Sequence, residues 1–185
     1  MMKWRRSRAA LLILTLTGID APAVDLPSGP GLGRPAPAEL IAAWDTDVMP
    51  DGTGLPPGRG SAQAGEALYR THCLTCHGEG GLGDSGDQLA GAKMGLTDEW
   101  PEKTIGNFWP YATTLFDFIR RSKPMQTPGS LSNDEVYALT AYLLNLNGIV
   151  GPDAVMDATT LPKVVMPNRN GFVDAWAAER DALRH

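Results

Sequence analysis

The sequence predicts an all-α fold, with one helical domain over residues 61–150 and an extended segment on each side of it. Residues 111–122 and 132–148 both place apolar side chains at helical spacing, and the second stretch opens with a capping box and ends at a glycine. A third helical stretch begins at Ser61, and no alternation of strands and helices accompanies these three. The length of 185 residues and the hydrophobic share of 43 % suit one domain with extensions.

Residues 1–23 predict a secretory signal peptide. Four basic residues come before an apolar run of about ten residues, and Ala21-Pro22-Ala23 matches an A-x-A cleavage site. A membrane anchor is the alternative, but spanning a bilayer takes about 20 apolar residues. We therefore expect export to the periplasm and no membrane attachment of the mature form.

Cleavage after residue 23 would leave an acidic protein. The remaining chain has 12 basic and 20 acidic residues, a net charge of −8, against −5 for the whole sequence. Nucleic acids and anionic membrane surfaces both attract proteins that present a positive field. We therefore expect no nucleic-acid partner, and a basic patch on a partner protein would suit this chain better.

Two extensions flank the predicted domain. Residues 24–60 are rich in Gly and Pro, with a short helix expected from Pro37 to Trp44, and residues 151–185 are mostly extended, with a short helix expected at the end. Such segments wrap their own domain, dock on a partner or stay disordered, and the composition leaves these alternatives open.

The helix that begins at Ser61 carries Gly65, Tyr69 and Cys73, spaced four residues apart and therefore aligned on one face. Gly65 would let another backbone come close, and Tyr69 would fill the space beside it. We expect both residues to contact Tyr142 or its neighbour, Leu143, on the last helix of the domain.

Cys73, Cys76 and His77 form the C-x-x-C-H motif of covalent c-type haem attachment. Two thiols three positions apart can each add to one vinyl group of the same porphyrin, and the adjacent His77 then becomes the proximal ligand of the iron. A thioredoxin-like pair would need a βαβ pattern, and a zinc site would need a second pair of ligands. The sequence shows neither, so it predicts one covalently bound haem c.

A glycine-rich stretch, residues 78–91, follows the motif. A phosphate-binding loop would need a preceding strand and a following Lys-Ser or Lys-Thr, and both are missing. A loop around the proximal side of the haem is the favoured interpretation. The backbone carbonyl that orients His77 cannot be identified from this sequence.

Trp109 and Tyr111 are candidate haem contacts. They belong to an aromatic segment just before the helix of residues 111–122, and each carries a donor that a haem propionate could accept. Arg120 and Arg121, at the end of that helix, are candidates to pair with the same propionate.

The loop after this helix, within RRSKPMQTPGSL of residues 120–131, is predicted to supply the distal ligand of the iron. A methionine thioether opposite the histidine is the ligand that raises the reduction potential of an electron-transfer haem. Met125 lies between two prolines, which restrict the loop and reduce the entropy lost when it becomes ordered. Met125 is the predicted distal ligand and Met166 its main rival. The weaker alternatives are Met94, Met49, Lys123 and His72.

Besides the haem motif, four stretches of the sequence resemble a known family. They are GLGRPAPAELIAAWDTDVMPDGTGLPPGRGS before the motif, and KTIGNFWPYATTLFDFIRRS, PGSLSNDEVYALTAYLLNLNGIV and MPNRNGF after it. Together they resemble the cytochrome c subunits of bacterial sulfite and sulfane dehydrogenases, the latter belonging to the Sox thiosulfate-oxidising system. The resemblance covers nearly all of the chain after residue 23. It implies a class I-like cytochrome c core with a single haem, although some sulfane dehydrogenase cytochromes that resemble this chain carry two.

The resemblance also implies a function. In that family a periplasmic molybdenum subunit oxidises the sulfur compound, and the cytochrome subunit accepts the electrons and passes them on to a downstream cytochrome c. This chain would then be an electron-transfer subunit with no catalytic residue of its own, since both cysteines serve the haem. The alternatives are a free electron shuttle and a five-coordinate haem that binds a gas or peroxide.

The chain departs from the family pattern at the distal loop. Met-Pro often follows the paired arginines in the family, whereas Lys123-Pro124 occupies those positions here and Met125 comes after them. The distal ligand would thus have shifted along the loop, or Met166 would serve instead.

Overall fold

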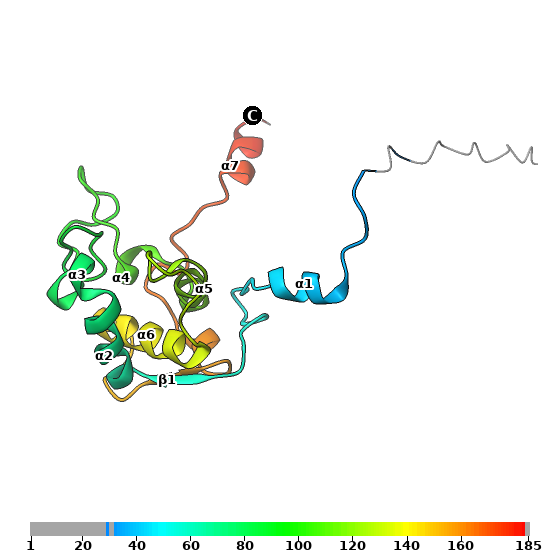
Figure 1. Ribbon diagram of the computed structural model, residues 1–185. Helices are drawn as coiled ribbons and strands as arrows, with labels where there is room; N and C mark the ends of the chain where they lie inside the picture. Colours follow the sequence, from blue (N-terminus) through cyan, green and yellow to red (C-terminus); the bar gives the residue numbers. More distant parts are fainter. Residues whose placement is uncertain (1–28, 30–31, 184–185) are drawn as a thin grey trace, which may run out of the picture. The chain divides into compact units, whose positions relative to one another are not determined.

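The computed structural model describes residue 29 and residues 32–183 (Figure 1). The predicted signal peptide, residues 1–23, lies outside them. The chain divides into two units, Met1–Ala38 and Glu39–His185, and the second contains the fold described below. Among the described residues, every helix is too short or too polar to cross a membrane.

The second unit is built almost entirely from helices, as the sequence predicts. The helices are α1 (Ala38–Trp44), α2 (Ala62–His72), α3 (Leu74–His77), α4 (Ile105–Phe108), α5 (Ala112–Ser122), α6 (Asn133–Leu146) and α7 (Ala175–Ala182), with 3-10 turns at Glu79–Gly81 (η1) and Leu161–Lys163 (η2). Two short strands, β1 (Arg59–Ser61) and β2 (Val155–Asp157), pair antiparallel with Gly60 opposite Met156.

The helix boundaries follow the capping signals in the sequence. The Ser61 hydroxyl accepts a hydrogen bond from the backbone N–H of Ala64 at 3.1 Å and so caps α2. Ser132 and Glu135 form the reciprocal bonds of the predicted capping box at the start of α6. The short helices expected near Trp44 and at the end of the chain are also present, as α1 and α7.

Helices α2 and α6 approach each other at Gly65. A Cβ atom added there would collide with the backbone carbonyl of Ala138 and would lie 2.7 Å from the Cβ of Tyr142. Beside this point the rings of Tyr69 and Tyr142 pack with their centroids 5.3 Å apart. The predicted contact of Gly65 and Tyr69 with Tyr142 is confirmed, and only the absence of a side chain allows the two backbones to come so near.

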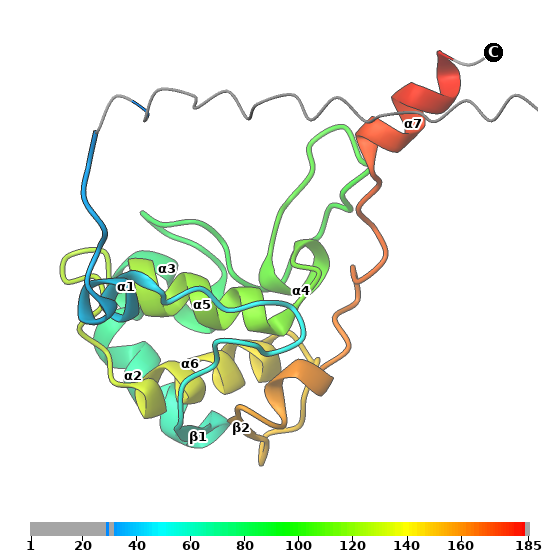
Figure 2. The ribbon, with the colours of Figure 1, turned by 90° about the vertical axis from the view of Figure 1, so that its right-hand side faces the viewer.

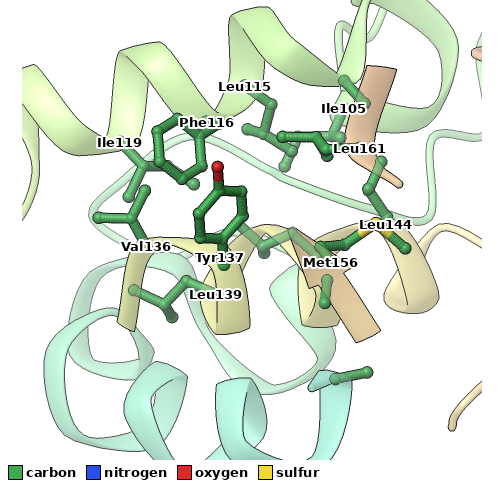
Figure 3. Close-up of a cluster of buried hydrophobic side chains, with 14 of the residues drawn as sticks. Ile105, Leu115, Phe116, Ile119, Val136, Tyr137, Leu139, Leu144, Met156 and Leu161 are labelled. Atoms are coloured by element: carbon green, nitrogen blue, oxygen red, sulfur yellow. The ribbon is translucent and has the colours of Figure 1, made fainter. Parts of the chain in front are cut away.

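Helix α5 covers another side of α6 and completes the main core (Figure 3). The rings of Phe116 and Tyr137 are both fully buried and lie 4.4 Å apart between their centroids. Leu115 and Ile119 belong to the same buried stripe of α5, as the helical spacing predicts.

Both extensions contribute to this core. Val48 comes from the N-terminal extension, while Met156, Leu161 and Met166 come from the C-terminal one. The core therefore runs beyond the predicted domain limits of 61–150. The physical reason is that single apolar residues in an irregular segment produce no periodic signal, although each buries its side chain in the folded state.

Residues 45–57 cross α5 and reach α6 on their way to β1 (Figure 2). Arg121 of α5 lies 3.5 Å from the Asp47 carboxylate. The buried Tyr137 hydroxyl donates a hydrogen bond to the Pro56 carbonyl at 2.9 Å, and the Asn133 amide donates one to the Pro57 carbonyl at 3.2 Å. Apart from the Asp47 carboxylate, the segment is thus held by its backbone carbonyls, which any residue type supplies.

Gly65→Ala is expected to destabilise the protein by about 1–3 kcal/mol, because the added methyl group must displace the α6 backbone. At an exposed helix position the same change would be stabilising. Urea unfolding of the haem-loaded protein measures the difference, with Glu66→Ala, a half-exposed neighbour in α2, as the control. A stabilising effect of Gly65→Ala would contradict the close approach.

Tyr137→Phe is expected to lower the free energy of unfolding by about 1 kcal/mol at pH 8, through loss of the hydrogen bond to Pro56. Burial raises the pKa of Tyr137 to about 12 from an ordinary value of 10.0. The neutral phenol therefore stabilises the fold fully below pH 10, and this contribution is lost as the pH rises from 10 toward 12. The free energy of unfolding, measured at pH 8 and at pH 11, should fall less between the two pH values for Tyr137→Phe than for the parent. An equal fall in both proteins would count against this assignment.

Candidate functional site

The C-x-x-C-H motif lies at the junction of α2 and α3. The backbone N–H of Cys73 closes α2 by donating to the Tyr69 carbonyl at 2.8 Å. The next turn starts at once, because the N–H groups of Cys76 and His77 donate to the Cys73 carbonyl at 3.1 and 2.9 Å. Cys73 and Cys76 are free, partly exposed thiols three positions apart on this turn, as attachment to two vinyl groups requires.

The His77 ring is oriented by a backbone carbonyl. Its Nδ1 atom lies 2.6 Å from the carbonyl oxygen of Asp87. Since a carbonyl oxygen can only accept, Nδ1 carries the proton and Nε2 keeps the lone pair that a metal ion needs. A hydrogen bond of this kind also fixes the ring and makes the ligating nitrogen more basic.

The glycine-rich stretch wraps around this histidine, as predicted. A Cβ atom at Gly86 would lie 3.2 Å from both the Cε1 atom of His77 and the Cβ of Cys76, so a side chain would crowd the ring. The backbone N–H of Gly86 donates to the Cys76 carbonyl at 2.7 Å, and that of Gly83 donates to the His77 carbonyl at 2.9 Å. Gly86 therefore allows the loop to turn back and present the Asp87 carbonyl.

The start of this loop is tied to α2. Gly78 adopts a φ of 73°, a conformation that favours glycine, and its carbonyl accepts a hydrogen bond from the Tyr69 hydroxyl at 2.8 Å. Tyr69 thus links the contact between α2 and α6 to the residue directly after His77.

The Cys73 thiol is partly buried against the core. Burial raises the pKa of this thiol to about 11, and the positive charge of Lys123 opposes the shift. The thiol is consequently protonated at neutral pH.

Trp109 and Phe118 form an aromatic pair. Their ring centroids are 5.6 Å apart, and the Lys123 Nζ lies 5.1 Å from the centroid of Phe118. The Lys123 ammonium group thus lies over the ring of Phe118. Phe118 is 43 % exposed although it is a large apolar side chain. Sequence reasoning missed it, but its position off the buried stripe of α5 was a signal that it serves another surface.

Tyr111 has a different environment from Trp109. The guanidinium group of Arg169 lies over its ring, 4.8 Å from the centroid. Tyr111 is thus held by the C-terminal extension, and its predicted contact with the haem stays a prediction.

The paired arginines at the end of α5 bind the N-terminal extension. Arg120 donates to the Thr46 carbonyl at 3.5 Å, and Arg121 pairs with Asp47 and with the buried carboxylate of Asp117. Both guanidinium groups already have partners here, so a role at a haem propionate would require them to serve two partners at once.

The two candidate distal ligands differ in burial. Met125 is 70 % exposed, in a loop whose turns are closed by hydrogen bonds from Thr127 to Pro124 and from Ser130 to Thr127. Met166 is 1 % exposed and belongs to the hydrophobic core. To bind the iron, the Met166 thioether would have to leave its position in the core. Met125 is therefore the side chain that is free to bind a ligand, and its assignment stays a prediction.

The side chains present fit haem c. Two free thiols and a histidine with a free Nε2 stand on one turn. Within residues 32–183, no group of three or more His, Cys, Asp or Glu side chains gathers in the manner of a zinc site.

Comparison with known proteins identifies the family. The family model described as Cytochrome c matches residues 62–147. A chain of the solved structure of the sulfane dehydrogenase SoxCD from Paracoccus pantotrophus matches 84 % of this chain and 77 % of its own length, with 45 % sequence identity and a TM-score of 0.75. The protein belongs to the cytochrome c family. No curated protein matches this cytochrome.

These matches confirm the fold class and the resemblance inferred from the sequence. As a cytochrome c, the protein functions in electron transfer and carries haem c covalently. The matched region begins with α2 and ends just after α6, so the two helices that meet at Gly65 bound it.

Met125→Ala is expected to abolish the near-infrared band of methionine-ligated ferric haem and to lower the reduction potential of this cytochrome, because thioether ligation raises it. Absorption spectroscopy and potentiometric titration of the haem-loaded protein measure the two effects.

Met166→Ala is the matched control. Removing this buried side chain is expected to cost about 2–5 kcal/mol of stability while the near-infrared band remains. The reverse pattern, with the band lost in Met166→Ala and kept in Met125→Ala, would assign Met166 as the distal ligand.

Proposed function

We propose that this cytochrome is a periplasmic electron-transfer subunit, exported by residues 1–23, that accepts electrons from a molybdenum-containing sulfite or sulfane dehydrogenase subunit. It then passes them to a downstream cytochrome c. The observation that carries the proposal is the match to a chain of the sulfane dehydrogenase SoxCD at 45 % identity over 84 % of this chain. Similarity at this level extends into both extensions, beyond the residues matched by the cytochrome c family itself.

The haem would be held by four side chains. Cys73 and Cys76 would form the thioether links, His77 would bind the iron through Nε2, and Met125 would bind opposite it. The carbonyl of Asp87 supports this arrangement, since it holds the His77 ring in one tautomer. One C-x-x-C-H motif implies one haem per chain.

The chemistry of the sulfur compound would take place on the partner. Both cysteines of the chain are assigned to the haem, which leaves no thiolate for a molybdenum centre. This chain then contributes a one-electron carrier, and its protein groups tune the potential through ligation and burial. The half-exposed aromatic pair, Trp109 and Phe118, would border the haem and set how much of it reaches solvent.

Exposed apolar side chains on both extensions favour a subunit over a free shuttle. Leu40, Ile41 and Trp44 lie on α1, and Trp176 lies on α7. None of the seven residues of α1 is buried. Clustered apolar surface of this kind is typical of protein interfaces, whereas a free carrier gains nothing from it.

Co-expression with a molybdenum sulfite or sulfane dehydrogenase subunit should give a stable complex in which the sulfur substrate reduces the haem. Affinity purification followed by visible spectroscopy measures both properties. Trp176→Ser is expected to weaken the complex without changing the haem spectrum, because its side chain is exposed. Recovery of a stable monomer, with no binding and no haem reduction under these conditions, would contradict the proposed function.

A further inference from the structure

We propose that residues 166–172, here called the C-terminal strap, position Trp109 beside the haem site, and that Asn168 is the positioning residue. The inference rests on the proposed function, since it takes Trp109 as a haem contact. It assigns the strap a part in setting the reduction potential.

Three of the seven residues of the strap contact the segment around Trp109, and a fourth anchors the strap in the core. Met166 is buried in the core at one end. The Asn168 side-chain amide donates to the Phe108 carbonyl at 2.8 Å, and the Phe172 ring packs on the Phe108 ring with centroids 5.5 Å apart. Figure 2 shows this orange segment passing beside α4 on its way to α7.

The strap also contacts the chain on the C-terminal side of Trp109. Arg169 lies over the Tyr111 ring, so the strap contacts the residue before and the residue after Trp109–Pro110. The Trp109 ring itself packs on Phe118 and, edge-on, on Phe108, with centroids 5.6 and 6.4 Å apart. The strap therefore fixes the backbone that carries Trp109, and with it the position of the indole ring.

The backbone at Trp109 needs such support. Helix α4 ends at Phe108, and the carbonyls of a last helical turn lack partners within the helix. Trp109 has an extended conformation, with φ −71° and ψ 126°, and Pro110 has no N–H to donate. The Asn168 amide supplies the partner that the Phe108 carbonyl would otherwise lack, and this bond sets the direction in which the chain leaves α4.

Two backbone turns of the strap hold Asn168 in place. Backbone hydrogen bonds from Arg169 to Met166 and from Gly171 to Asn168, both 3.1 Å, close two successive turns around this residue. A Cβ atom at Gly171 would collide with the Asn168 side-chain amide. Gly171 thus leaves the room in which that amide is held, and Gly171→Ala should disturb the same bond from a second position.

A displaced Trp109 would open the haem to solvent, and exposure lowers the reduction potential of a haem. The experiment compares Asn168→Leu and Gly171→Ala with the parent, in the full-length haem-loaded protein, by potentiometric titration and Soret circular dichroism. Both variants are expected to lower the potential, so that the ratio of reduced to oxidised haem at a fixed ambient potential falls severalfold. Asn168→Ser, which keeps a donor, should recover part of the shift.

Asn145→Leu is the matched control, because the Asn145 amide also donates to a backbone carbonyl, that of Val150, at 2.9 Å. It should reduce stability and leave the potential unchanged. An unchanged potential and dichroism in Asn168→Leu would overturn the inference. Trp109→Leu then separates the causes: if it shifts the potential while Asn168→Leu does not, the strap has no positioning role, and if neither shifts it, the proposed haem contact of Trp109 is itself wrong.

Discussion

The contact between α2 and α6 at Gly65 is the constraint on which the rest of the structure depends. It allows Tyr69 to pack on Tyr142 and to reach the Gly78 carbonyl, directly after the histidine of the haem motif. The helix that crosses α6 at Gly65 therefore also leads directly into the first thiol, Cys73, at its C-terminal cap. Haem attachment and core packing share one element, so each is precise only when the other is formed.

The helices were predictable because their signals are local. Capping residues and apolar stripes act within a few residues of one another, and they placed α2, α5 and α6 correctly. The haem motif is equally local, and its three residues lie on one turn. The contact of Gly65 with α6 was also predictable, since a glycine and an aromatic residue four positions apart indicate a close crossing.

What escaped prediction depends on pairs far apart in sequence or on backbone atoms. The Asp87 carbonyl orients His77, but every residue has a carbonyl, so no side chain marks the position. The pairing of Gly60 with Met156 joins segments that have no strand pattern of their own. Phe118 was overlooked because it is apolar without belonging to the buried stripe. Met125 is a different case, because the sequence did predict its role as distal ligand, and that role depends on the bound haem.

The pairing of β1 with β2 joins the two ends of the helical domain. Strand β1 leads into α2 and strand β2 follows α6. Neither end of the domain can therefore fray without breaking the pairing that also holds the other end. Both extensions pack on the core beyond this strand pair, through Val48 on one side and Met166 on the other, so the two ends of the helical domain are each held at two successive places.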